Sequence, residues 1–212
     1  MRDRFANGPE YFHSRKLDVL LGFLGKQGLR SESLRWLDLG CGTGELLRLG
    51  KAAFSEAWGC DVSEESLKQC NDLPVRVQDR MDRLPFDRES FDVVTAACVY
   101  HHVEPSQRER LTKTAYEVLR PGGVFCIFEH NPWNPVTKMI VNRSPVDVNA
   151  ILLSATEAET LMRAAAFEML TTQYFLFVPE FAKGIVVVES LLGSLPLGGQ
   201  YAVFGKRGLP GS

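Results

Sequence analysis

The sequence predicts an α/β domain in which a mostly parallel β-sheet lies between two layers of helices, a three-layer α/β/α sandwich. Short apolar runs at 34–39, 57–62 and 91–99 alternate with stretches whose apolar residues recur at helical spacing. The run at 91–99 is almost continuously apolar, as is typical of a strand that is covered on both faces. Because the first run ends in a glycine-rich turn, we expect a Rossmann-like sheet with a ligand site at the carboxyl end of its first strand.

The first half of the chain is expected to alternate strands and helices without interruption. An N-terminal helix is expected over about 9–28, with glycines as its stop signals. Ser63, followed by acidic residues, is expected to start a helix after the second strand, and Val75–Val77 to form a third strand. Ser106 and Glu109 have the spacing of a capping box and are expected to open a helix that ends at Arg120-Pro-Gly-Gly.

The regular pattern continues to a strand over 124–129 and then breaks. An irregular connection is expected over about 131–153, until a second capping box, Ser154 and Glu157, starts another helix. The last strands are expected at 168–177 and 201–204, separated by an apolar helical stretch around 185–191. We expect one domain over 1–212, with a core over about 33–130 and a loose tail over about 206–212.

Composition excludes several classes of protein. The 212 residues are 45% hydrophobic and 24% charged, with 24 Lys and Arg against 26 Asp and Glu, so the net charge is -2 and favours neither nucleic acid nor an anionic membrane. The longest apolar run falls far short of the roughly 20 residues that span a bilayer, and no export signal is apparent. The five cysteines form no C-x-x-C pair, which indicates reduced thiols, a cytoplasmic location and no metal site.

The turn after the first strand has the composition of a cofactor loop. Gly40, Gly42 and Gly44 allow a tight turn and a close approach of a ligand to the backbone. Glu45 occupies the place where a dinucleotide fingerprint has its third glycine, which disfavours a nicotinamide-dependent oxidoreductase. Asp61 follows at the end of the second strand, where a carboxylate can accept hydrogen bonds from both ribose hydroxyls of a nucleoside.

These motifs and their order resemble the class I S-adenosylmethionine-dependent methyltransferases, most closely over about residues 34–130. The resemblance implies seven strands in the order 3-2-1-4-5-7-6 with the seventh antiparallel, S-adenosylmethionine as cofactor, and in-line SN2 transfer of its methyl group to a small-molecule acceptor. The motifs that carry it are Leu37-Asp-Leu-Gly-Cys-Gly-Thr-Gly, Gly59-Cys-Asp-Val-Ser, Leu84-Pro-Phe, Ser90-Phe-Asp-Val-Val, Tyr100-His-His-Val and Leu119-Arg-Pro-Gly-Gly.

The resemblance also assigns cofactor contacts. It places Asp38 with the glycine loop at the methionine end, Asp61 at the ribose, and the main chain near Ala97 and Cys98 at the amino group. At the adenine end, counting back from Leu84 gives Arg80 and Met81, whereas a register one residue different gives Asp79 or Asp82; both assignments stay open. The complete expected set is Asp38, Gly40, Cys41, Gly42, Gly44, Asp61, Val62, Arg80, Met81, Ala97 and Cys98.

Polar residues after the fourth and fifth strands are candidates for the acceptor side. His101, Glu129 and His130 are expected to be catalytic or to orient the acceptor; the alternative is that they cap helices and loops. The residues expected to contact the acceptor are Tyr11, Tyr100, Asn131 and Trp133, for which packing in a helix or turn is the competing interpretation.

Two other functions compete with methyl transfer. One is a catalytically silent S-adenosylmethionine-binding module that acts in regulation or assembly. The other, disfavoured by Glu45, is the nicotinamide-dependent oxidoreductase. The sequence leaves open the nucleophilic atom of the acceptor and whether the protein is a monomer or a homodimer.

Overall fold

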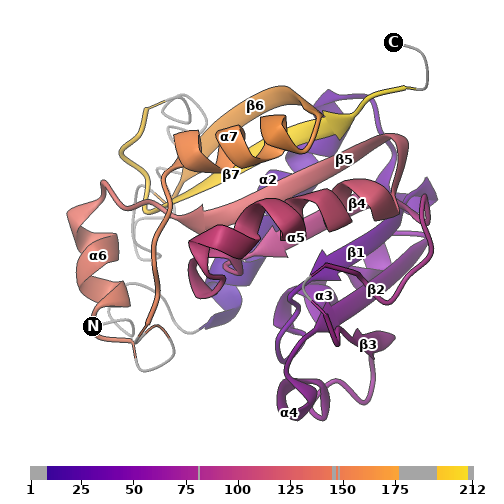
Figure 1. Ribbon diagram of the computed structural model, residues 1–212, viewed down its shortest axis with the longest axis horizontal. Helices are drawn as coiled ribbons and strands as arrows, with labels where there is room; N and C mark the ends of the chain where they lie inside the picture. The colour runs from indigo at the N-terminus through magenta and orange to yellow at the C-terminus, as the bar shows by residue number, and fades with distance from the viewer. Residues whose placement is uncertain (1–8, 81, 145–146, 148, 177–194, 210–212) are drawn as a thin grey trace.

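The computed structural model of the chain describes residues 9–80, 82–144, 147, 149–176 and 195–209, which form a seven-stranded sheet flanked by helices (Figure 1). The strands are β1 (Arg35–Leu39), β2 (Glu56–Asp61), β3 (Val75–Val77), β4 (Phe91–Ala97), β5 (Leu119–His130), β6 (Phe167–Phe175) and β7 (Gln200–Arg207). The α-helices are α2 (Pro9–Lys26), α3 (Glu45–Gly50), α4 (Glu64–Leu67), α5 (Pro105–Val118), α6 (Pro135–Val141) and α7 (Ala155–Ala164).

The strand order is β3-β2-β1-β4-β5-β7-β6, which confirms the order that the family resemblance implied. Neighbouring strands from β3 to β5 pair in parallel, whereas β7 is antiparallel to both β5 and β6. The carboxyl ends of the five parallel strands therefore meet at one edge of the sheet, and side chains that follow these strands gather there.

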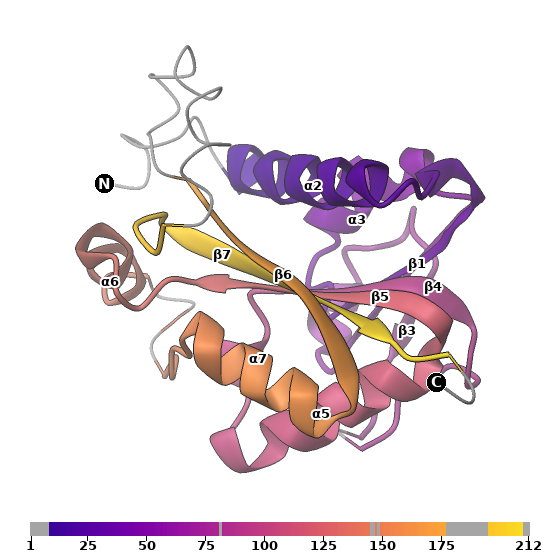
Figure 2. The same ribbon diagram turned by 90° about the horizontal axis from the view of Figure 1, so that it is seen from above.

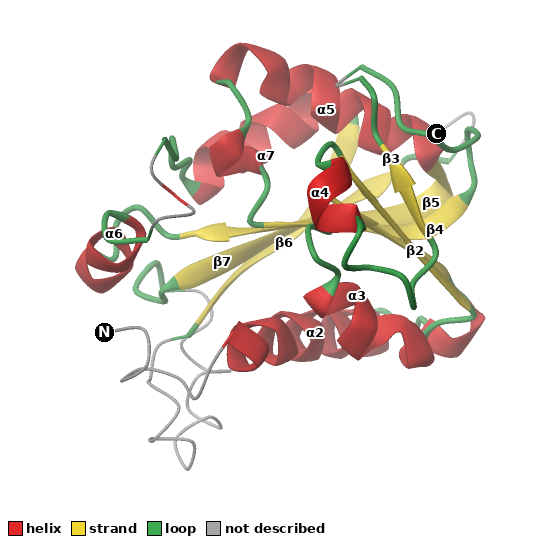
Figure 3. Cartoon of the chain, turned by 90° about the horizontal axis from the view of Figure 1, so that it is seen from below, coloured by secondary structure: helices red, strands yellow, loops and turns green. Residues whose placement is uncertain are grey.

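Helices cover both faces of the sheet, with α2 and α3 on one face and α5 and α7 on the other (Figures 2 and 3). Successive strand residues point to opposite faces and enter separate cores. Trp36 and Val93 pack on the side of α2, whereas Leu37 and Val94 pack on the side of α5. The continuous apolar pattern of β4 thus reflects burial on both faces, as predicted.

Helix α2 is fixed across the sheet by aromatic and aliphatic contacts. Phe23 stacks on Phe204 of β7, with ring centroids 3.9 Å apart, and Leu20 and Leu24 are buried beside it. The helix continues past Gly25 and ends before Gly28, whose φ of 72° is a left-handed conformation suited to glycine. This packing brings the first turns of α2 to the edge where the parallel strands end.

Three expectations about element boundaries are wrong. Helix α5 starts at Pro105 instead of at a Ser106 capping box, because proline is preorganised for the first helical position and needs no N–H partner there. Strand β7 extends to Arg207, which bonds to backbone carbonyls at the end of α5 and pairs with Glu89, so the sheet includes residues assigned to the tail.

The third error concerns the connection after β5, which contains the regular helix α6. Asn134 caps this helix by accepting hydrogen bonds from the N–H groups of Val136 and Thr137, and Pro135 occupies its first turn. The capping box of Ser154 and Glu157 at the start of α7 is present as predicted. The helical stretch expected around 185–191 lies outside the described residues, and none of the described helices is long and apolar enough to cross a membrane.

Candidate functional site

The three loop glycines all have left-handed φ values, 69° at Gly40, 55° at Gly42 and 82° at Gly44. A Cβ at Gly40 would lie 2.5 Å from a methyl group of Val99, and one at Gly44 would overlap Leu73, so packing alone requires both glycines. A Cβ at Gly42 would meet no atom within 4 Å. Gly42 therefore borders open space at the carboxyl end of β1, where a ligand can approach the backbone.

Asp61 is locked against this loop. Its Oδ2 accepts a hydrogen bond from the Gly42 N–H at 2.8 Å, and its Oδ1 accepts one from the Ser63 N–H at 2.8 Å. Each carboxylate oxygen has two lone pairs, so Asp61 retains the capacity to accept from a ligand. Val62, next to it, is 59% exposed and offers an apolar surface on the same side.

Asp38 is buried beneath the loop at the end of a hydrogen-bonded chain. The Trp36 Nε1–H donates to Thr95 Oγ1 at 2.9 Å, and the Thr95 hydroxyl donates to Asp38 Oδ1 at 2.8 Å. Burial raises the pKa of the Asp38 carboxyl to about 7, although the Thr95 hydrogen bond and the charge of Lys16 oppose the shift. A cationic ligand group would stabilise its ionised form.

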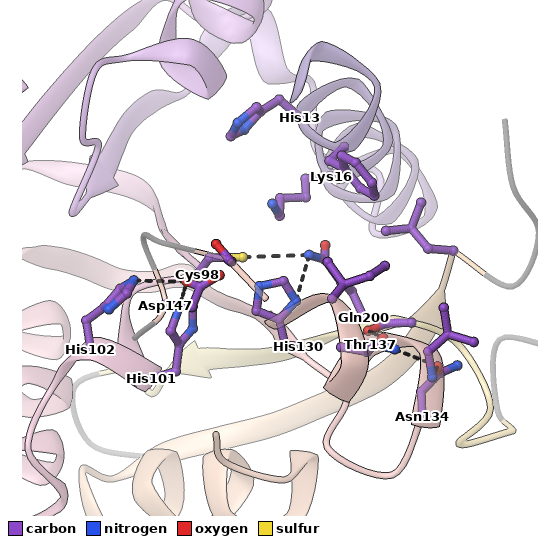
Figure 4. Close-up of a pocket in the computed structure, with 16 residues that line it drawn as sticks. His13, Lys16, Cys98, His101, His102, His130, Asn134, Thr137, Asp147 and Gln200 are labelled. Carbon is purple, nitrogen blue, oxygen red and sulfur yellow. Dashed lines mark hydrogen bonds and ion pairs between the residues drawn. The ribbon is translucent and has the colours of Figure 1, made fainter. Parts of the chain in front are cut away.

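Lys16, which the sequence reasoning missed, reaches this edge from α2. It is only 3% exposed, and its side chain lines a cavity (Figure 4). The signal was present, because Lys16 shares the buried helical stripe of Leu20 and Leu24 at intervals of four residues. A buried ammonium group needs polar surroundings, which the cavity and the carboxylate of Asp38 provide here.

The cavity has a volume of about 300 Å³ and lies at the carboxyl ends of β4 and β5. All four histidines of the chain line it: His13 from α2, His101 and His102 after β4, and His130 at the end of β5 (Figure 4). It is also lined by Phe12, Lys16, Cys98, Asn134, Val136, Thr137, Ile140, Ser144, Asp147, Leu176, Gly199 and Gln200.

A buried His–Glu pair forms one wall of the cavity. Glu129 is fully buried, and its Oε2 lies 2.7 Å from His101 Nδ1, while backbone N–H groups of His101 and His130 also donate to its carboxylate. Burial alone lowers the pKa of His101, but the hydrogen bond and charge of Glu129 outweigh burial and hold that pKa above its ordinary value. Burial raises the pKa of Glu129, and the same interactions with His101 more than reverse this shift.

Asp147 and Gln200 complete this wall, and neither was singled out by sequence. Asp147 Oδ1 lies 3.3 Å from His101 Nε2. Gln200 Nε2 lies 3.4 Å from His130 Nδ1 and 3.7 Å from Cys98 Sγ. Both residues reach the site from segments distant in sequence from β4, so local patterns gave no signal for them.

Two of the expected acceptor contacts are structural instead. Tyr100 is fully buried, and its hydroxyl bonds to Thr112 Oγ1 at 2.8 Å in the core under α5. Asn131 is also fully buried, and its amide donates to the carbonyls of Pro196 and Gly198, which fixes the loop before β7. These polar groups satisfy the backbone and other side chains and do not line the cavity.

The other two expected contacts, Tyr11 and Trp133, also lie outside the cavity lining. Trp133 is 73% exposed, and its backbone N–H is bonded to Asn131 Oδ1, as in a turn. Tyr11 makes an edge-on ring contact with Phe12, and from the same helix Phe12 reaches the cavity instead.

At the end of β4, Cys98 has a φ of 61°, a conformation that non-glycine residues rarely adopt. Its N–H donates to Phe128 O, and its side chain lines the cavity, while Ala97 precedes it at the strand end. Cys41, in the glycine loop, donates its N–H to Cys60 O, and burial raises the pKa of its thiol far above the usual range. Its thiol is buried and its backbone fixes the loop, and its contact with the cofactor stays a prediction.

The expected adenine end borders a second cavity, of about 350 Å³, after β3. Asp79 and Arg80 both line it. The Arg80 guanidinium forms a two-pronged ion pair with Asp82, so these two side chains satisfy each other at the surface. Met81 lies outside the described residues.

Comparisons with known proteins find similarity to methyltransferases. Residues 37–127 match a family model described as a methyltransferase domain. The chain is 29% identical over 133 residues to an uncharacterized methyltransferase of Synechocystis, covering 61% of the chain and 59% of that protein. It is 36% identical over 99 residues to 27-O-demethylrifamycin SV methyltransferase of Amycolatopsis mediterranei, covering 42% of the chain and 36% of that protein. The chain thus matches less than two thirds of the length of either relative.

A solved structure shares the fold across nearly the whole chain. A SAM-dependent methyltransferase from Archaeoglobus fulgidus superposes with a TM-score of 0.68 at 18% identity, covering 90% of this chain and 94% of that one. The sheet order, the glycine loop followed by Asp61, and the domain match agree with one another. Residues 37–127 therefore match a methyltransferase domain, and the chain as a whole has the fold of S-adenosylmethionine-dependent methyltransferase structures.

Proposed function

We propose that the protein transfers a methyl group from S-adenosylmethionine to a small-molecule acceptor held in the cavity beside β4 and β5. The observation that carries this proposal is the open space at Gly42, bordered by Asp61, at a sheet edge where the charged groups of Asp38 and Lys16 are buried. A volume of about 300 Å³ suits a small molecule. The name of the rifamycin relative also specifies a small-molecule acceptor.

The residues present fit the cofactor. Asp61 would accept from the ribose hydroxyls, and Asp38 would face the cationic amino group. Lys16, whose ammonium is buried beside Asp38, would pair with the carboxylate of the methionine end. When bound, S-adenosylmethionine supplies a methyl group that is activated for SN2 displacement by its positive sulfonium.

The protein's own contribution on the acceptor side is orientation and control of charge. Glu129 holds the His101 ring through Nδ1, and Gln200 contacts His130, so both rings have fixed positions in the cavity wall. Holding a nucleophile in near-attack geometry accounts for much of the acceleration in such a reaction. A proton acceptor is needed only when the nucleophile loses a proton as it attacks.

The first test is cofactor binding by Asp61→Ala. We expect affinity for S-adenosylmethionine to fall by about 2 kcal/mol, roughly thirtyfold, because charge-assisted hydrogen bonds to the ribose are lost. Isothermal titration calorimetry measures this change. Asp72→Ala removes a nearby carboxylate that pairs with Arg48, and it is the matched control that retains full affinity. Unchanged affinity in folded Asp61→Ala would place the nucleoside elsewhere, and tighter binding of NAD than of S-adenosylhomocysteine would favour the oxidoreductase.

A second test separates ligand approach from backbone strain. Gly42→Val is expected to abolish cofactor binding, because the new side chain projects into the open space of the loop. Gly28→Val is the control, since Gly28 has a similar φ of 72° and equally open surroundings but lies at the end of α2. Both variants should lose about 1–2 kcal/mol or more of stability from strain, and only Gly42→Val should lose binding. Equal binding by the two would make the loop a simple turn.

The third test uses the pKa of Asp38, about 7 in the cofactor-free protein. Since only the carboxylate attracts the cofactor's ammonium, affinity should rise with pH from about 5.5 and be roughly tenfold weaker one pH unit below that pKa than at the plateau. The part of this rise between about pH 5.5 and 7 lies below the titration of an α-amino group, at about 7.7–8.0, and is the part to measure. Asp38→Asn should bind weakly with a flat pH profile, and calorimetry at several pH values checks both.

The raised pKa of Asp38 has the opposite pH dependence for stability: affinity for the cofactor should rise with pH, whereas the stability of the cofactor-free protein should fall. A carboxyl with a raised folded-state pKa binds more protons when folded, so its contribution to stability falls as pH rises from about 4 to about 7. Thermal melting of the wild type and of Asp38→Asn across this range measures the difference. A wild-type profile identical to that of the variant, for both stability and affinity, would contradict the assignment of Asp38.

The fourth test concerns the acceptor side. His101→Ala, Glu129→Gln and His130→Ala should each leave cofactor affinity within about threefold, under about 1 kcal/mol, and lower turnover of the acceptor. Metabolite extract incubated with methyl-labelled cofactor supplies the acceptor for the assay. Glu109→Gln, on the exposed surface of α5, is the control for both measurements. If all three variants turn over at the wild-type rate, these residues are structural caps; if wild-type protein binds cofactor and labels nothing, the silent binding module is favoured.

A further inference from the structure

Three potential metal ligands converge on one wall of the cavity. One ring nitrogen of His101, one of His102 and one carboxylate oxygen of Asp147 lie within 4.8 Å of one another, and all three residues line the cavity (Figure 4). Asp147 Oδ1 is 3.3 Å from His101 Nε2 and 3.6 Å from His102 Nε2. His101 and His102 follow β4, whereas Asp147 comes from the segment after α6, so the fold and not the local sequence brings them together.

The spacing suits a first-row metal ion. Zinc ligands lie about 2.0–2.2 Å from the ion, and in a tetrahedral site they are therefore roughly 3.3–3.6 Å apart. The two distances to Asp147 match this range. His102 is partly exposed, with 43% of its side chain accessible, so its ring has room to adjust to the ion.

His101 carries an independent sign of a missing partner. Its ring is 1% exposed, and Nε2 is buried without a hydrogen-bond partner among the described residues, although the Asp147 carboxylate lies close by. A buried ring nitrogen without a hydrogen bond is costly unless something else satisfies it. An ion placed between this nitrogen and the Asp147 oxygen would satisfy both.

Glu129 supplies the outer support that metal-binding imidazoles usually have. Its carboxylate lies 2.7 Å from His101 Nδ1 and accepts the proton of that nitrogen; in the neutral ring the Nε2 lone pair is then left for a ligand. A carboxylate behind a ligating histidine fixes the ring and makes it more basic. Glu129 and Asp147 together also bring two negative charges to the cluster, which a divalent cation would neutralise.

We propose that His101, His102 and Asp147 bind one divalent first-row transition-metal ion of the Zn²⁺ type, with Glu129 as the residue that positions His101. Two imidazole nitrogens and one carboxylate favour such an ion over Mg²⁺ or Ca²⁺, which prefer oxygen ligands. Three protein ligands leave a coordination position for water or a cavity ligand, as in catalytic zinc sites. The competing interpretation is an imidazolium of His101 held between two carboxylates with no metal.

The test is titration of the chelator-treated 212-residue chain with Co²⁺, a spectroscopic substitute for Zn²⁺, followed by competition with Zn²⁺. We expect one equivalent to bind, with visible d–d absorption of a four- or five-coordinate site that Zn²⁺ abolishes. His102→Ala and Asp147→Asn should each weaken binding at least tenfold, and Glu129→Gln about 10–100-fold. His13→Ala is the matched control and should bind like the wild type, because His13 lines the same cavity outside the cluster.

Several outcomes would overturn the site. Absence of stoichiometric Co²⁺ binding by the wild type would leave the imidazolium interpretation. Binding that persists in both His102→Ala and Asp147→Asn, or an intense near-ultraviolet thiolate-to-cobalt band, would place the metal elsewhere, for example on one of the five cysteines. Near-ultraviolet circular dichroism of each variant confirms that it is folded, and cofactor titration of the same samples keeps this result separate from the proposed methyl transfer.

Discussion

The Glu129 carboxylate is a buried charge at the junction of two strand ends, and the arrangement of the site depends on satisfying it. An ionised carboxylate without partners inside a protein costs several kcal/mol. Here the donors come from His101 and His130, through two backbone N–H groups and one ring nitrogen. The chain after β4 therefore turns towards the end of β5, which brings His101 to the cavity beside His130.

Buried charge also shapes the proposed cofactor side, where the charged groups of Asp38 and Lys16 are buried. Asp38 accepts one hydrogen bond from Thr95 and has its pKa raised mainly by burial, and the charge of the nearly buried Lys16 opposes that shift. A fold selected only for stability would replace such groups with apolar side chains. The presence of Asp38 and Lys16 near Gly42, which borders open space, has an explanation if a ligand binds there. The ammonium of such a ligand would pair with Asp38, and its carboxylate would pair with Lys16.

Local chemistry explains which features were predictable from sequence. The glycine loop and Asp61 follow from residue type and position at strand ends, and the structure places them together as expected. Tyr100 was misassigned because its place after a strand does not reveal that its hydroxyl turns into the core. Lys16 was missed although its place on the buried stripe of α2 is a local signal, because that stripe alone does not show which edge of the sheet α2 reaches. Asp147 was missed because it reaches the edge from the segment after α6, which no local pattern encodes. Helix α6 was not predicted, because an asparagine–proline pair is found at helix starts as well as in turns, and an irregular connection was expected there.

The distribution of carboxylates along the sheet edge links the two parts of the site. A sulfonium cofactor and a divalent metal are both positive, so holding them in neighbouring regions of low dielectric requires compensating negative charge. Asp38 and Asp61 lie on the proposed cofactor side, whereas Glu129 and Asp147 lie on the proposed acceptor side, on separate strands and segments. Each positive group would thus face its own carboxylates. Since the carboxylates are anchored by backbone and side-chain hydrogen bonds, the electrostatic field of the edge is already in place before a ligand enters.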